Sequence, residues 1–390
     1  MKNGKLRKIV RDIYHYPKER HIKNEYRNFL KNEIYHKYNY VDRTMSYLNN
    51  MKNNVESVSF SNSSHMDSIY SVTYGCLVEA MYGEISNDEK IELKNYFDTH
   101  QRKEDGLYWD RKYDVKGFFY GTDGWGARHL VPHITIALDR IDYQPKYEFT
   151  YLDKYKNPDD MIRWLDSLDY HNVWGSSNAI MNYGVAMQYA RDRMNGNYSS
   201  SIAAMEEYLL KRINSYGMWY EGEISSPEDR NEMIRGAYHI LPILYYDGIE
   251  VPNCENAVEE ILKSQNKWGG FDTYIASSAC EDIDGLDPLL RYSIMAGMTN
   301  DKRVIDAINK AENWILFNQN EDGGFVFEKD TPFSYGGQKT LSSVAGESNM
   351  FATWFRCVSL ELINEFFDEK KSVFIRTPGY ELPLRKGECR

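Results

Sequence analysis

The sequence lacks most of the short motifs by which enzyme classes are recognised. It has no GxSxG nucleophile elbow, no HExxH zinc motif, no Walker loop and no GxGxxG dinucleotide fingerprint. Its five cysteines are odd in number and show no CxxC or other metal-ligand spacing. We therefore expect no resident metal or cofactor from these motifs, and a reducing, cytoplasmic environment.

Long apolar runs are also missing. No window approaches the ~20 apolar residues of a membrane-spanning helix, and the basic N-terminus lacks an apolar signal region. The net charge is −11, although residues 1–50 hold twelve Lys/Arg against five Asp/Glu. An acidic body without a nucleic-acid motif predicts no nucleic-acid partner. The basic segment 1–50 is either a solvated helix surface docked on the protein itself or a contact for a membrane surface or partner protein.

The sequence does contain a repeat. Residues 319–325 (QNEDGGF) closely match residues 265–271 (QNKWGGF), 54 positions earlier. Residues 126–132 (GARHLVP) match residues 236–242 (GAYHILP) at an offset of 110, about twice that spacing. Within each repeat an amphipathic helix, a loop and a more apolar helix follow one another. Such a period is typical of helical repeat architectures.

We predict an all-α fold, an (α/α)6 barrel or toroid of six outer and six inner helices. Each helix pair can bury its apolar face only against its neighbours, so a closed ring is expected. Residues 1–55 are predicted to be a basic helical arm that contributes the first outer helix, residues 56–367 the toroid, and residues 368–390 a C-terminal tail. The starts of the inner helices should converge on one mouth.

The repeat register places polar and aromatic residues at this mouth. His129 and His239 occupy equivalent positions, and Asn178 falls at the same register. Two histidines at equivalent points of apolar helices leave a functional role and a buried structural role both open. Helix starts also favour polar residues for capping alone. The other residues expected to bind a substrate are Arg128, Arg235, Glu232, Asn349, Trp125, Trp174 and Tyr238.

The densest acidic cluster is residues 280–288 (CEDIDGLDP), with four carboxylates in seven residues. Their mutual repulsion predicts that at least one has a raised pKa and holds a proton at neutral pH, as a general acid must. Asp287 before Pro288 is explained as a helix N-cap with proline at the first helical position. Asp282 and Asp284 have no such explanation. A divalent cation between them is the competing use of their oxygens, although the spacing is not that of a calcium loop.

These residues carry a family resemblance. Residues 319–325 resemble the QW-type repeat of squalene and terpene cyclases, and residues 281–284 resemble the DxDD acid motif of class II terpene cyclases. Gly285 stands where that motif has a further aspartate. The resemblance implies an α/α toroid of the terpene cyclase and protein prenyltransferase superfamily. It also implies that Asp284 matches the aspartate that protonates an alkene or epoxide.

Our leading hypothesis is a cytoplasmic enzyme that performs acid-triggered cyclisation of a prenyl-type substrate. Asp284 would be the general acid and Asp282 would tune it, while His129, His239 and Asn178 orient the substrate or stabilise charge. The second hypothesis is a carbohydrate-active enzyme, a lyase, hydrolase or epimerase, with an oligosaccharide substrate at the same polar mouth. The 32 tyrosines suit a semi-polar pocket of either kind. A non-catalytic binding scaffold is the third.

Overall fold

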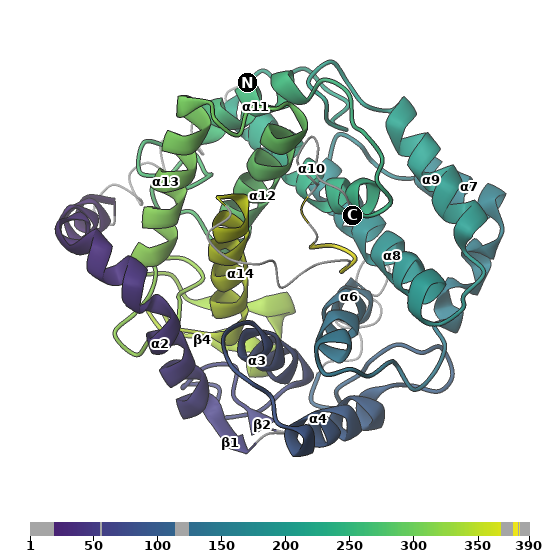
Figure 1. Cartoon of the computed structure of the whole chain (residues 1–390), viewed down its shortest axis with the longest axis horizontal. Helices are drawn as coiled ribbons and strands as arrows, with labels where there is room; N and C mark the ends of the chain where they lie inside the picture. The colour runs from purple at the N-terminus through teal and green to yellow at the C-terminus, as the bar shows by residue number, and fades with distance from the viewer. Residues whose placement is uncertain (1–18, 55–56, 114–124, 368–376, 381, 383–390) are drawn as a thin grey trace.

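The computed structural model describes residues 19–54, 57–113, 125–367, 377–380 and 382 of the 390-residue chain. These residues form an all-α toroid, which confirms the predicted fold class (Figure 1). Outer and inner helices alternate along the chain. The outer helices are α2 (Glu33–Met51), α4 (Asn87–His100), α7 (Pro158–Asp166), α9 (Ser199–Lys211), α11 (Cys254–Ser264) and α13 (Lys302–Phe317). The inner helices are α3 (Ile69–Tyr82), α6 (Trp125–Arg140), α8 (Val173–Arg193), α10 (Pro227–Tyr246), α12 (Ala279–Met295) and α14 (Met350–Phe366).

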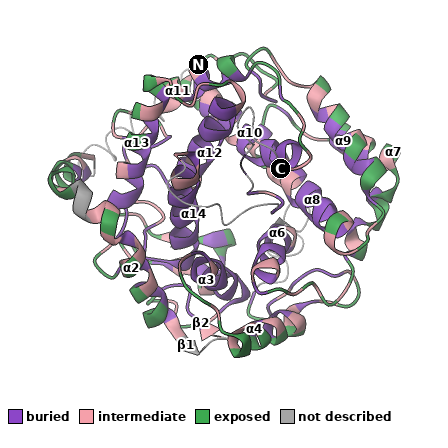
Figure 2. Cartoon of the chain, in the orientation of Figure 1, coloured by how far each residue is buried: buried purple, intermediate pink, exposed green. Residues whose placement is uncertain are grey.

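The inner helices form a closed ring. Each contacts the next in the order α3, α6, α8, α10, α12 and α14, and α14 returns to α3. Figure 2 shows the inner helices as largely buried, whereas the outer helices expose one face. Burial of apolar surface between neighbouring helices is the main stabilising term in such a ring.

Short elements connect the helices. Strands β1 (Lys52–Asn54) and β2 (Ser57–Val58) form one antiparallel pair, and β3 (Phe333–Ser334) and β4 (Ser342–Ser343) form another. In the second pair Phe333 is opposite Ser343. The 3-10 turns are η1 (Leu30–Asn32), η3 (Thr150–Lys156), η4 (Tyr335–Gly337) and η5 (Lys339–Leu341). The loop that contains β3 and η4 delivers Tyr335 to the interior of the ring.

The Gly-Gly turns of the repeat join neighbouring outer helices. The Gln319 amide Nε2 donates to the Gly323 carbonyl at 2.9 Å and to the Tyr40 carbonyl of α2 at 3.0 Å. Gly323 has φ of 92°, and an added Cβ would collide with the Arg43 carbonyl of α2. This turn therefore fixes the end of α13 against the first outer helix, where the ring closes.

The same joint occurs at two other places. Gln265 donates to the Gly269 carbonyl at 3.0 Å and to a carbonyl of α13 at 2.8 Å. Gln101, at the end of α4, donates to the Gly106 carbonyl and to the Tyr147 carbonyl, both at 2.9 Å. A glutamine and a glycine with positive φ thus recur at the ends of outer helices. The repeated residues therefore have a structural role.

Side-chain capping sets the start of α12. The Ser278 hydroxyl accepts from the Glu281 backbone N–H, and the Glu281 carboxylate accepts from the Ser278 N–H at 2.8 Å. Because the helix begins at Ala279, Asp287 and Pro288 lie inside it. The prediction that Asp287 is an N-cap is therefore wrong. Asp287 instead pairs with Arg291 one turn later, at 2.5 Å.

The described part of the basic N-terminal segment packs on the outside of the ring. Residues 19–29 form a helix whose Ile22 and Tyr26 are buried against Trp314 and Phe317 of α13. Figure 1 shows this helix at the rim, beside α13. The contact of residues 1–50 with a membrane or partner stays a prediction. Among the described helices, none combines the length and the hydropathy needed to cross a bilayer.

Candidate active site

A cavity of about 570 Å³ lies within the inner ring. This volume is in the range of small-molecule sites, roughly 300–1,000 Å³. Helices α6, α8, α10, α12 and α14 supply most of its wall, and the loop before α8, the loop at Tyr335 and the C-terminal segment supply the rest. The lining residues that bear on its chemistry are His129, His133, Trp174, Asn178, Tyr238, His239, Cys280, Asp284, Tyr335, Phe351, Phe355, Pro378, Gly379 and Tyr380.

Asp284 is the acid of this cavity. It lies on the second turn of α12, is only 2 % exposed, and its Oδ2 has no hydrogen-bond partner among the described residues. Burial raises the pKa of this carboxyl well above its ordinary value, and the positive charge of Arg235 only partly opposes the shift. The cavity thus contains a carboxyl whose pKa is raised by burial and whose Oδ2 has no partner among the described residues.

The surroundings of Asp284 form an ordered polar network. Trp174 lines the cavity together with Asp284 and partly opposes the rise in the pKa of its carboxyl. Arg235 lies over the Trp174 ring at 5.0 Å from its centroid and pairs with Glu281 at 2.7 Å and Asp272 at 3.4 Å. The Arg235 charge is therefore shared with two carboxylates. This arrangement holds Trp174 in place and reduces the effect of the Arg235 charge on the pKa of Asp284.

Three histidines line the cavity and are uncharged. Burial lowers the pKa of His129 and of His239 to about 3, and it lowers the pKa of His133 well below its ordinary value. His129 Nδ1 lies 2.7 Å from the Tyr335 hydroxyl, and His239 Nε2 lies 3.3 Å from the Asn178 amide. These contacts fix the rings, so the imidazoles present defined edges to the cavity.

Aromatic rings make up much of the remaining wall. Phe351 lies 4.8 Å from Tyr335 and 4.6 Å from Phe355, measured between ring centroids. Tyr238 lines the wall beside His239, with 4.9 Å between their ring centroids. The faces of such rings carry partial negative charge and attract cations at about 6 Å or less. The cavity therefore combines one carboxyl of raised pKa with aromatic rings and uncharged imidazoles.

Comparison with known proteins gives one similar solved structure to report here. No family model matches the chain, and no curated protein matches it in sequence. The solved structure is an arginine-to-alanine variant of the type II terpene cyclase MstE from Scytonema, in complex with its substrate geranylgeranyl dihydroxybenzoate. It is 13 % identical over 86 % of this chain and 99 % of its own length, with a TM-score of 0.46.

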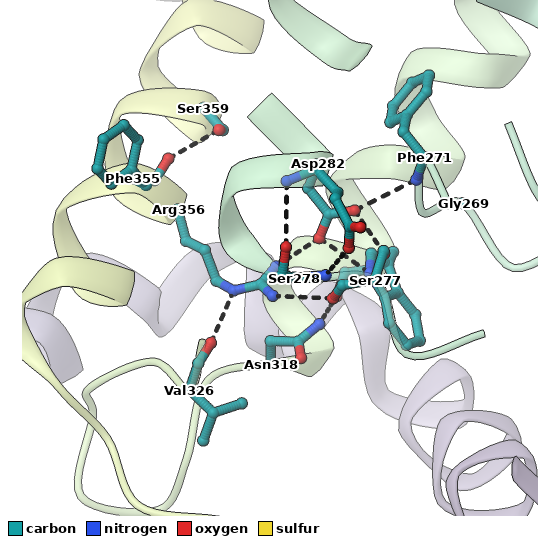
Figure 3. Close-up of polar contacts among 12 residues, drawn as sticks. Gly269, Phe271, Ser277, Ser278, Asp282, Asn318, Val326, Phe355, Arg356 and Ser359 are labelled. Carbon is teal, nitrogen blue, oxygen red and sulfur yellow. Dashed lines mark hydrogen bonds and ion pairs between the residues drawn. The ribbon is translucent and has the colours of Figure 1, made fainter. Parts of the chain in front are cut away.

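Six of the residues predicted for the site meet at the cavity, namely Asp284, His129, His239, Asn178, Trp174 and Tyr238. Asp282, which was predicted to tune the acid, lies elsewhere. Its Oδ2 accepts from Arg356 at 2.8 Å (Figure 3) and from the Trp314 indole at 3.0 Å. Its Oδ1 accepts from the Ser277 hydroxyl at 2.6 Å and the Phe271 N–H at 3.3 Å. Asp282 therefore links α12 to α13 and α14 instead of facing the cavity.

The contacts of Asp282 also bear on the predicted cation. Four donors occupy its two oxygens, which leaves no lone pair for a cation shared with Asp284. Among the described residues, no group of three His, Cys, Asp or Glu side chains is arranged to hold a metal. We therefore assign Asp282 a structural role.

The other predicted residues support the ring. Asn349 caps α14 by accepting from the Ala352 N–H at 2.9 Å, and it is fully buried. The Glu232 carboxylate accepts from the Trp174 N–H at 2.8 Å, so it positions the start of α8. Arg128 lies 5.3 Å from the centroid of a tyrosine ring of α8, outside the cavity lining. Trp125 begins α6, but its side chain is outside the described residues.

Sequence reasoning missed several lining residues. His133 and Phe355 each lie four positions after another lining residue, His129 and Phe351, and so share its helix face. That spacing could have identified both. Tyr335 in the loop and Tyr380 in the C-terminal segment belong to no periodic pattern, and their positions depend on tertiary contacts alone.

Proposed function

We propose that the cavity binds an apolar, prenyl-type substrate and that the Asp284 carboxyl protonates it to start a cyclisation. The observation that carries this proposal is the buried acid with its unpartnered Oδ2. A carboxyl that stays protonated at neutral pH can donate a proton, and the aromatic wall around it offers no polar competitor at that oxygen.

The reaction balances without a cofactor. The Asp284 proton adds to one carbon of a substrate double bond, which leaves a carboxylate on the enzyme and a carbocation on the neighbouring carbon. A second double bond of the chain attacks this carbon and closes a ring. Loss of a C–H proton to a base then gives a cyclic isomer of the substrate, and the solvent returns a proton to Asp284.

The cavity suits the intermediates of this scheme. The faces of Trp174, Tyr335 and Phe351 can stabilise a carbocation by cation–π attraction. The neutral imidazoles can accept the final proton, because a carbocation is a far stronger acid than an imidazolium, even one of low pKa. His133 Nε2, which is buried without a partner among the described residues, can accept a proton in the tautomer whose Nδ1–H donates to the Tyr380 hydroxyl.

A carbohydrate-active enzyme is less well supported. Glycoside hydrolysis ordinarily uses two carboxyl groups across the scissile bond. Asp284 is the one carboxyl among the described residues that line the cavity. The imidazole and amide edges could still bind a polar ligand, so oligosaccharides belong in the test. The third possibility is a binding scaffold without catalytic activity.

The test is substitution of Asp284 by asparagine, assayed with linear prenyl substrates of graded length and with oligosaccharides, with products identified by mass spectrometry. We expect Asp284→Asn to abolish prenyl turnover and to leave the melting temperature nearly unchanged, because a neutral amide replaces a neutral acid of the same shape. Asp160→Asn, in the first turn of α7 and outside the cavity lining, is the control and should keep full activity. Retained turnover in Asp284→Asn would refute the acid role, and turnover of an oligosaccharide would refute the substrate class.

A further inference from the structure

The C-terminal segment 377–380 lies inside the ring. Thr377 is fully buried, and its hydroxyl oxygen accepts from Arg140, the last residue of α6, at 3.1 Å. Tyr380 is 6 % exposed, and its hydroxyl lies 3.2 Å from His133 Nδ1. Because His133 precedes Arg140 by seven residues on the same helix, the segment spans about 10 Å along the helix axis. It therefore runs from the C-terminal end of α6 toward the cavity. Figure 1 shows the segment within the ring of inner helices.

Two features hold this segment in place. The Tyr380 ring packs edge-on against Trp354 of α14, with 5.7 Å between ring centroids. Gly379 has φ of 93°, a conformation that other residues rarely adopt, and it lies against Val185 of α8. The segment is thus fitted to α6, α8 and α14 at once.

We propose that this segment is the floor of the cavity and that Tyr380 sets the length of apolar chain that the cavity accepts. Pro378, Gly379 and Tyr380 line the cavity, whereas Asp284, Trp174 and Asn178 line it near the starts of α12 and α8. A chain whose reactive end lies at Asp284 therefore extends toward Tyr380. The inference rests on the proposed function for the chemistry of the ligand, but the floor itself depends only on the cavity.

The consequence is a change in length preference. Replacing Tyr380 by alanine removes the ring from the floor and lets a longer chain enter. Each further buried methylene improves affinity roughly fourfold. We therefore expect Tyr380→Ala to change the ratio of affinities for a twenty-carbon over a ten-carbon chain by about tenfold or more, in favour of the longer chain. Tyr380→Phe removes only the hydroxyl and should leave the ratio unchanged.

The experiment measures dissociation constants calorimetrically for prenyl alcohols of ten, fifteen and twenty carbons and for straight-chain alcohols of matched length. The proteins are wild type, Tyr380→Ala, Tyr380→Phe and the control Tyr216→Ala, whose side chain is exposed at the surface. Tyr380→Leu, which keeps an apolar contact with Trp354, carries the test should Tyr380→Ala fail to fold. A shift of the affinity ratio toward longer chains in Tyr380→Ala or Tyr380→Leu, with no shift in Tyr380→Phe or Tyr216→Ala, supports the floor.

The other outcomes separate the two proposals. An unchanged length preference in folded Tyr380→Ala and Tyr380→Leu overturns the floor and leaves the acid chemistry of Asp284 standing. A shift seen with straight-chain alcohols, in a protein that binds no prenyl alcohol, supports the floor and overturns the prenyl substrate. Binding of none of these probes by wild type overturns both.

Discussion

Asp282 and Asp284 are two residues apart on α12, and we predict opposite consequences for their substitution. Asp282 accepts hydrogen bonds from Arg356, Trp314, Ser277 and Phe271 and is 2 % exposed. Asparagine in its place has the same shape but no charge, and its amide nitrogen is a donor where an acceptor is needed. The substitution therefore leaves the Arg356 guanidinium, which is 1 % exposed, without its counter-ion.

The size of the effect follows from this burial. Removing one partner of a buried ion pair typically costs about 3–5 kcal/mol, because the remaining charge stays desolvated and unpaired. With an unfolding entropy of roughly 2.1 cal/mol/K per residue, the melting temperature of a 390-residue chain shifts by about 1.2 °C per kcal/mol. We therefore expect Asp282→Asn to lower the melting temperature by ~4–6 °C.

A double-mutant cycle by thermal and urea unfolding is the assay. Arg356→Met removes the cation and fills its space with an apolar side chain. The double variant Asp282→Asn/Arg356→Met should be destabilised by less than the sum of the single variants, with a coupling of more than about 2 kcal/mol. Asp160→Asn, which removes the exposed ion pair of Asp160 with Arg163, should cost less than about 1 kcal/mol. Additive losses at Asp282 and Arg356 would refute this reasoning.

The remaining predictions concern pH and the repeat joint. Burial and the neighbouring Asp247 raise the pKa of Glu206 to about 9, while Arg191 keeps Asp247 ionised. Since this folded-state pKa exceeds the unfolded value, the stabilising contribution of protonated Glu206 is complete below about pH 4.5 and is lost as the pH rises to about 9. Glu206→Gln should remove this loss of stability, which amounts to up to about 1.4 kcal/mol per pH unit. Melting temperatures measured from pH 5 to pH 9 should therefore fall less steeply in the variant than in wild type. The same pH dependence in both proteins would contradict the prediction. Gly323→Ala should lower the free energy of urea unfolding by more than about 2 kcal/mol, because Gly323 has a positive φ and an added Cβ would collide with the Arg43 carbonyl. Gly297→Ala, where φ is positive but the space is open, should lower it by about 1–2 kcal/mol. Equal losses in the two variants would show that the contact with α2 is unimportant.

The fold could be predicted because its joints are encoded locally. Gln265 and Gln319 each bridge their own turn glycine and the next outer helix, so the same short sequence recurs wherever one helix pair meets another. The repeat period then fixes the alternation of outer and inner helices. Closure follows from burial, since an open array would leave one apolar face of the inner ring in water.

The site was harder to predict because register within a helix decides which side chain faces the cavity. Residues two apart on an α-helix differ by about 200° in direction, so Asp282 and Asp284 cannot share a face. The signal was present in the sequence: Ser278 and Glu281 form a capping box that marks the start of α12. Recognising it would have placed Asp287 inside the helix and separated Asp282 from Asp284. The contribution of Tyr380 had no comparable signal, because it comes from a segment without periodicity.

The contrast among the three aspartates of α12 is the strongest argument for a functional site. Asp282 has Arg356 and three further donors, and Asp287 has Arg291 at 2.5 Å. Both buried charges are thus fully compensated, as buried charges in native proteins ordinarily are. Asp284 is buried to the same extent but keeps one oxygen without a partner, at the wall of a cavity. An unsatisfied buried polar atom costs about 1–3 kcal/mol, and the sequence could have removed this cost with an apolar residue. Glu206 also keeps a buried oxygen without a partner, so the position of Asp284 at the cavity wall, which Glu206 does not share, is what supports the proposed acid role.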